Sequence, residues 1–193
     1  MQFPVWGLVS SLAFGFVAAA AIALFRAPDL SVIQGYERIP GTGDEVRNLQ
    51  RELESALETR SEKLVIGERE LNDYIYRSLE GRQKGMLGGW ALNFRRVYVD
   101  LEPGYCEVVI AREIFGRPLT MSLRCTIEER EKVRIKRLVG GRLGSIRAAP
   151  GFFALLRGSF FNLMDVYRPE IDAVFMMGAI SFAKDRLVLD PRL

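Results

Sequence analysis

The fold is decided by residues 105–127, YCEVVIAREIFGRPLTMSLRCTI, in which two runs of alternating apolar and polar residues flank Phe115 and Gly116. Alternation with a period of two is typical of half-buried β-strands. A two-residue hairpin turn at Phe115 and Gly116 fixes the register between the two runs. Three pairs of apolar or thiol side chains then lie opposite one another: Ile110 with Met121, Val108 with Leu123, and Cys106 with Cys125.

Cys106 and Cys125 are the two cysteines of the chain, and this register places them side by side. Opposed cysteines in an extracytoplasmic domain can form a disulfide, whereas in a reducing compartment they pack as thiols across the sheet. Both states of the pair are compatible with the sequence.

The alternation continues on both sides of the hairpin and predicts four antiparallel strands, over residues 92–101, 105–114, 117–127 and 132–139. From Leu119 to Ile127 in the third strand, the odd-numbered residues are apolar or cysteine and the even-numbered residues between them are polar. We therefore expect a meander sheet with one buried face and one wet face.

The segment before the meander alternates between helix and strand. A capping box at Thr42 and Glu45 predicts the start of an amphipathic helix that ends near Arg60. Residues 63–66 are a strand candidate, and helical spacing of apolar residues resumes over residues 68–79. The glycine-rich stretch that follows is expected to be a connection, with a lid as the alternative.

The C-terminal third is unusually rich in apolar residues: six of the twelve phenylalanines lie between Phe152 and Phe182. Pro150 can start a helix, and a second helix follows Pro169. Apolar residues occupy nearly every side of these helices, which must therefore be covered all round. Four arrangements meet that need: a well-wrapped core, a cavity filled by lipid, a surface that dips into the membrane, or a dimer interface. The side chains expected to line a cavity are Phe152, Phe153, Leu156, Phe160, Phe161, Met164, Phe175 and Met176.

At the other end of the chain, Val5 to Phe25 is a run of 21 residues without a charge. At about 1.5 Å rise per residue, a helix of this length spans about 30 Å, the thickness of bilayer hydrocarbon. Trp6 and Arg26 suit the two interfaces. A cleaved signal peptide is the alternative, but the basic residues that should precede it are missing. We expect a permanent single-pass anchor.

The chain thus divides into a transmembrane anchor over residues 1–26, a tether rich in proline and glycine over residues 27–43, and one domain over residues 44–193. Roughly 150 residues are about enough for one domain with a useful core. The expected fold class is α+β, an N-terminal transmembrane helix followed by an antiparallel meander sheet packed on amphipathic and apolar helices.

Composition excludes several classes of function. The balance of 27 basic and 24 acidic residues, a net charge of +3, is too weak to indicate nucleic acid. The chain has no histidine, which removes the commonest general base and transition-metal ligand. No two carboxylates have a spacing that indicates an acid–base pair, and GGRLGS at residues 140–145 is a loop that fits no nucleotide-binding motif. We expect no catalytic residues, no metal and no cofactor.

One segment carries a resemblance. In LVIGERELNDYIYRSL, residues 64–79, a helix with Glu70, Leu71 and Asn72 follows the first strand. With the meander, the apolar helices and a terminal hairpin, this order resembles membrane-anchored bacterial proteins of unknown function that have a Glu-Leu-Asn helix at this place. Some such families are similar to the tubular lipid-binding proteins, in which apolar ligands lie between a long helix and a curved sheet. The resemblance covers most of residues 44–192 and implies a lipid-binding domain on the extracytoplasmic side.

The expected function is therefore non-enzymatic: a domain at the cell membrane that binds or carries a lipid or another apolar ligand. The alternative is a structural or assembly subunit whose apolar C-terminal helices pack on a membrane-protein partner. Lys132, Arg134 and Lys136 form a basic tract that is expected either to contact lipid headgroups or to be a solvated strand face.

Overall fold

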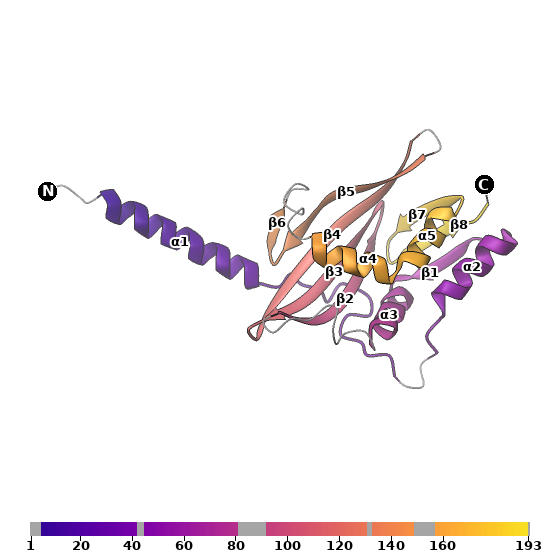
Figure 1. Cartoon of the computed structure of the whole chain (residues 1–193), viewed down its shortest axis with the longest axis horizontal. Helices are drawn as coiled ribbons and strands as arrows, with labels where there is room; N and C mark the ends of the chain where they lie inside the picture. The colour runs from indigo at the N-terminus through magenta and orange to yellow at the C-terminus, as the bar shows by residue number, and fades with distance from the viewer. Residues whose placement is uncertain (1–4, 42–44, 81–91, 131–132, 149–156, 193) are drawn as a thin grey trace.

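The computed structural model describes residues 5–41, 45–80, 92–130, 133–148 and 157–192. Its architecture is α+β with antiparallel sheets, as the sequence predicts (Figure 1). The described helices are α1 (Val5–Phe25), α2 (Leu49–Thr59), α3 (Glu68–Leu79), α4 (Arg157–Val166) and α5 (Arg168–Met176). The strands are β1 (Leu64–Gly67), β2 (Leu92–Glu102), β3 (Tyr105–Ile114), β4 (Arg117–Arg130), β5 (Val133–Leu143), β6 (Ile146–Ala148), β7 (Ala179–Ala183) and β8 (Arg186–Asp190).

The central hairpin of β3 and β4 has the predicted turn and register. Phe115 and Gly116 have φ angles of 47° and 77°, the two left-handed positions of a tight hairpin turn. Cys106 lies opposite Cys125, and Ile110 lies opposite Met121. Alternating side chains and a two-residue turn were therefore sufficient to fix this part of the sheet.

The hairpin is the middle of a five-stranded sheet of order β2-β3-β4-β5-β6. The prediction of a loop over residues 140–145 is wrong for residues 140–143, because β5 continues to Leu143 and Gly141 pairs with Leu123, and only residues 144–145 form a turn. Glycines can occupy a strand where a β-bulge re-aims it, and the register shifts here between Arg124 and Cys125. A second sheet of order β1-β8-β7 holds the predicted terminal hairpin.

Helix α3 has the predicted bounds, whereas α2 begins later than its proposed capping box. The N-cap of α2 is Asn48, whose side-chain oxygen accepts a hydrogen bond from the Arg51 backbone N–H at 3.2 Å. Thr42 lies outside the described residues, as does the glycine-rich stretch after α3.

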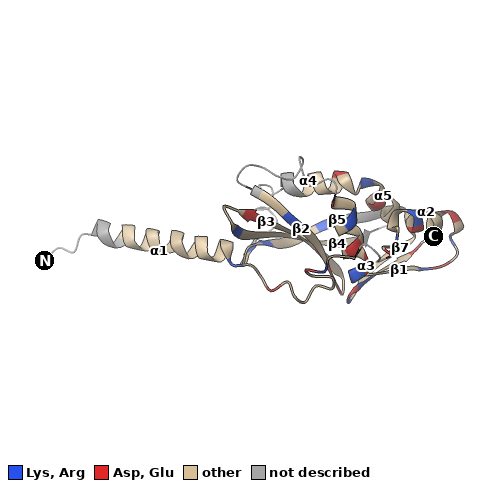
Figure 2. Ribbon diagram, turned by 90° about the horizontal axis from the view of Figure 1, so that it is seen from below, with Lys and Arg blue, Asp and Glu red and all other residues tan. Residues whose placement is uncertain are grey.

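The two faces of the larger sheet are covered by different parts of the chain. Helices α4 and α5 lie over the inner face, and the tether passes beneath the outer face (Figure 2). Leu30 and Ile33 of the tether pack there against Tyr98 and Val109. The expectation of a wet outer face is therefore wrong, since Ser122 on that face is only 4% exposed and donates a hydrogen bond to Glu107 at 2.5 Å.

Two buried side chains of α3 fasten the tether to the edge strand β2. The Glu68 carboxylate accepts hydrogen bonds from the backbone N–H groups of Gln34 and Leu101, each at 2.6 Å. The Asn72 amide donates to the carbonyls of Gln34 and Val99 and accepts from the Val99 N–H at 2.7 Å. Both side chains are fully buried.

Helix α1 has the predicted bounds and projects from one end of the domain (Figure 1). Its last turn is held by the β5–β6 turn, where Ser145 donates both its backbone N–H and its hydroxyl to the Ala23 carbonyl at 3.0 and 2.9 Å. Among the residues that the structure describes, no helix meets the length and hydropathy of a membrane span.

Candidate functional site: an apolar cavity beneath the C-terminal helices

A cavity of about 320 Å³, partly open to solvent, lies between the inner face of the larger sheet and the helices. The alternation in β2, β3 and β4 sends every second side chain toward it. The sheet contributes Val97, Val99, Cys106, Val108, Leu123 and Cys125, with Thr126 and Ile127 farther along β4.

The opposite wall comes from the four described helices that follow the tether. Leu49 and Leu53 of α2 and Ile75 of α3 are buried, as are Phe160 and Leu163 of α4. Helix α5 differs, because none of its residues is buried although Ile171, Val174 and Phe175 line the cavity. The inner face of α5 is thus apolar but only partly covered by protein, which indicates space for another apolar group.

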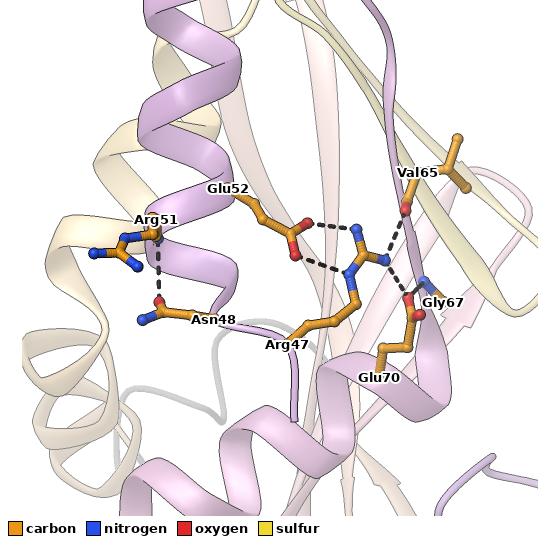
Figure 3. A network of polar contacts seen from close by, with 7 residues as sticks. All are labelled: Arg47, Asn48, Arg51, Glu52, Val65, Gly67 and Glu70. Atoms are coloured by element: carbon orange, nitrogen blue, oxygen red, sulfur yellow. Dashed lines mark hydrogen bonds and ion pairs between the residues drawn. The ribbon is translucent and has the colours of Figure 1, made fainter. Parts of the chain in front are cut away.

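A network of charged side chains holds α2 in place as part of this wall (Figure 3). Arg47 pairs with Glu52 of α2 and donates to Glu70 of α3 at 2.8 Å. Glu70 also accepts a hydrogen bond from the Gly67 N–H at 2.9 Å, which caps α3. The guanidinium fork of Arg47 therefore joins the start of α2 to the start of α3.

The predicted lining residues divide into three groups. Phe160, Met164 and Phe175 line the cavity. Met176 does not line it and is 67% exposed at the end of α5. Phe152, Phe153 and Leu156 lie outside the described residues, and the side chain of Phe161 is not described.

The predicted headgroup contacts are placed only in part. Lys132 lies outside the described residues, and Arg134 and Lys136 belong to β5, where their side chains are not described. The headgroup contact therefore stays a prediction.

No family model, curated protein or solved structure matches this chain. The cavity and its lining are therefore the observations that bear on function. The described residues contain no group of three or more side chains that could hold a metal ion.

Polar atoms are few in the cavity wall. The Tyr74 hydroxyl donates to Oε1 of Glu170 at 2.6 Å. The Tyr167 hydroxyl lies 2.7 Å from the Ser78 hydroxyl and donates to the Ile75 carbonyl at 3.1 Å. These contacts tie α3 to the C-terminal helices at one side of the cavity. Sequence reasoning missed this group because its members lie about 90 residues apart and show no local motif.

The two cysteines line the cavity from neighbouring strands, and no disulfide joins them in the structure. The disulfide therefore stays a prediction. Burial raises the pKa of the Cys106 thiol to about 12, and the neighbouring Cys125 adds to the shift. A thiol with such a pKa is protonated at neutral pH and is a poor nucleophile. The described part of the cavity wall is therefore suited to apolar contact.

Proposed function

We propose that this chain is a membrane-anchored, non-enzymatic domain that binds or carries a lipid or another apolar ligand in the cavity. The observation that carries the proposal is the space of about 320 Å³ with an almost wholly apolar lining. Small-molecule sites typically enclose about 300 to 1,000 Å³ and are lined by apolar and aromatic side chains. Water gains little in such a space, whereas an apolar ligand is stabilised by the apolar area that it buries.

The proposed anchor is α1, with the domain on the extracytoplasmic side of the cell membrane. The helix has 21 residues and no charge, and its side chains are described from Val9 onward. Phe14 and Phe16 are each 77% exposed. Contact of these apolar side chains with water is unfavourable, whereas contact with the hydrocarbon of a bilayer carries no such free-energy cost. The extracytoplasmic placement rests on the resemblance to membrane-anchored bacterial proteins.

The test measures the ligand directly. The full chain is purified in mild detergent, and native mass spectrometry and lipid extraction identify any bound apolar molecule. Val108→Phe adds volume to the cavity wall and is expected to reduce ligand occupancy at least about tenfold. Val139→Phe makes the same change at a site on β5 that is 47% exposed, and it should leave occupancy unchanged.

Wild-type protein that carries no apolar molecule and takes up no fluorescent apolar probe would contradict the proposal. Equal occupancy in the Val108→Phe and Val139→Phe variants would show that any bound molecule lies elsewhere.

A second candidate function is an assembly subunit that packs on a membrane-protein partner. It is favoured by Met164 and Met176 on the C-terminal helices, which are 43% and 67% exposed. Met176 does not line the cavity, so Met176→Ser should reduce co-purification of a partner in mild detergent without changing ligand occupancy. A variant that keeps its partner in full would contradict the assembly role and leave the lipid proposal in place.

A further inference from the structure

One carboxylate oxygen in the cavity wall has no hydrogen-bond partner among the described residues. Glu170 of α5 lines the cavity, and its Oε1 accepts the hydrogen bond from Tyr74. Its Oε2 is buried and unpaired. Buried polar atoms are nearly always hydrogen-bonded, so an unpaired carboxylate oxygen indicates a missing donor.

The described wall of the cavity supplies no such donor. Glu170 is the one charged residue among those that line it, and no lysine or arginine faces it there. The Tyr167 hydroxyl is directed to the Ile75 carbonyl and the Ser78 hydroxyl. Among the described residues, then, none fills the place of this donor, and a group on the ligand can take it.

We propose that the ligand has an apolar body and a hydrogen-bond-donating head, a hydroxyl or an ammonium group, which binds Oε2 of Glu170. This inference rests on the proposed function and narrows its ligand class. A long-chain alcohol or amine can donate to the carboxylate while its chain fills the apolar space. A free fatty acid would place its own carboxylate beside that of Glu170, and the low dielectric of the cavity strengthens the repulsion between the two charges.

The test compares ligands that have different polar head groups on the same alkyl chain. A fluorescent apolar probe is bound to the full chain in detergent and then displaced by an alcohol, an amine and a carboxylic acid of the same chain length. The alcohol and the amine should displace the probe at concentrations about tenfold to a hundredfold lower than the acid, the range expected for a hydrogen bond to a charged group.

Three substitutions distinguish a loss of head-group recognition from a loss of folding. Glu170→Gln should remove most of the preference for the alcohol and amine over the acid. Asp172→Asn changes an exposed carboxylate two residues along the same helix and should keep the preference. Tyr74→Phe leaves Glu170 in place but removes the hydrogen bond that Tyr74 donates to its Oε1, so the preference should persist or increase even if Glu170→Gln does not fold.

The failures are distinguishable. Displacement by alcohol and acid at equal concentrations, in wild type and in Tyr74→Phe alike, would overturn the assignment of the head while leaving an apolar binding site. A wild-type chain that binds no apolar probe would overturn the proposed function together with this inference.

Discussion

Asn72 illustrates how one buried side chain can take the place of a neighbouring strand. Strand β2 is an edge of the larger sheet, so the outer N–H and C=O groups of Val99 have no strand to pair with. The amide of Asn72 bonds both groups, and its second N–H bonds the carbonyl of Gln34 in the tether. The side chain therefore closes the edge and fastens the tether at the same point.

Asn72→Ala should strongly destabilise the domain. The substitution leaves the Val99 N–H and C=O buried without partners, and each unpaired group costs about 1 to 3 kcal/mol. We expect the free energy of unfolding, measured by urea denaturation, to fall by more than about 2 kcal/mol. Asn93→Ala removes an exposed asparagine from the same strand and should change it by less than about 0.5 kcal/mol. Similar losses in the two variants would contradict the strand-replacing role.

Glu107 on the outer face makes stability depend on pH. Burial raises its pKa, but hydrogen bonds from Ser122 and Arg124 and the charge of Arg142 outweigh burial, so the net pKa lies below its ordinary value of 4.5. A carboxyl with a depressed folded-state pKa stabilises the fold above its unfolded pKa and loses this contribution as the pH falls through the folded value.

Glu107→Gln should therefore lower stability at pH 7 but have a smaller effect at acid pH. The difference in unfolding free energy between wild type and variant should be largest above about pH 5 and should shrink steadily below about pH 4.5. Urea denaturation at a series of pH values measures it. A difference that stays constant down to pH 3 would show that the carboxylate charge has no such role.

At the scale of elements, the sequence predicts those parts of the fold that short-range patterns determine. The β3–β4 register was correct because Phe115 and Gly116 form a two-residue turn between two alternating runs. The start of α2 was wrong because the capping signal at Thr42 competes with Asn48, whose side chain caps the helix in the folded protein. Two capping signals of similar strength cannot be ranked from the sequence alone, because tertiary contacts decide where the helix begins. Here the contacts are those of Arg47.

The cover of the outer face and the walls of the cavity were harder to predict. Leu30 and Ile33 lie in a turn-rich segment without periodicity, so nothing in the sequence places them on the sheet. The apolar helices could be recognised as candidates for a cavity wall, and Phe160 and Phe175 do line one. Helical periodicity cannot show, however, which side of α5 faces the sheet, and Met176 points away.

At the scale of the whole molecule, the proposed anchor α1 is attached directly to the domain that contains the cavity. Ser145 holds the last turn of α1 against the larger sheet, and Asn72 holds the tether that follows α1. The end of α1 and the tether that follows it are therefore both attached to the domain. If α1 crosses a bilayer, the cavity is kept near the membrane surface from which an apolar ligand would be taken or to which it would be delivered.

A single arginine in α1 tests the anchor. Val17→Arg places a charge near the middle of the helix, which costs about 2.5 to 3.5 kcal/mol on the insertion scale. Insertion of full-length protein, measured as the ratio of the fraction retained in membranes after alkaline extraction to the fraction released, should fall about a hundredfold. Val32→Arg makes the same change in the tether, where the side chain is 66% exposed against 64% for Val17, and should leave the retained fraction unchanged.

Comparing the Val17→Arg and Val32→Arg variants distinguishes insertion into the membrane from non-specific adsorption to its surface. Both variants gain one positive charge and lose one exposed valine, so weaker adsorption to the membrane surface would affect them equally. Only a helix that passes through hydrocarbon discriminates between the two positions, because a charge is costly at the centre of the bilayer and not in water. Wild-type protein that stays in solution without detergent, or equal release of the two variants, would show that α1 does not span the membrane and that the cavity works apart from it.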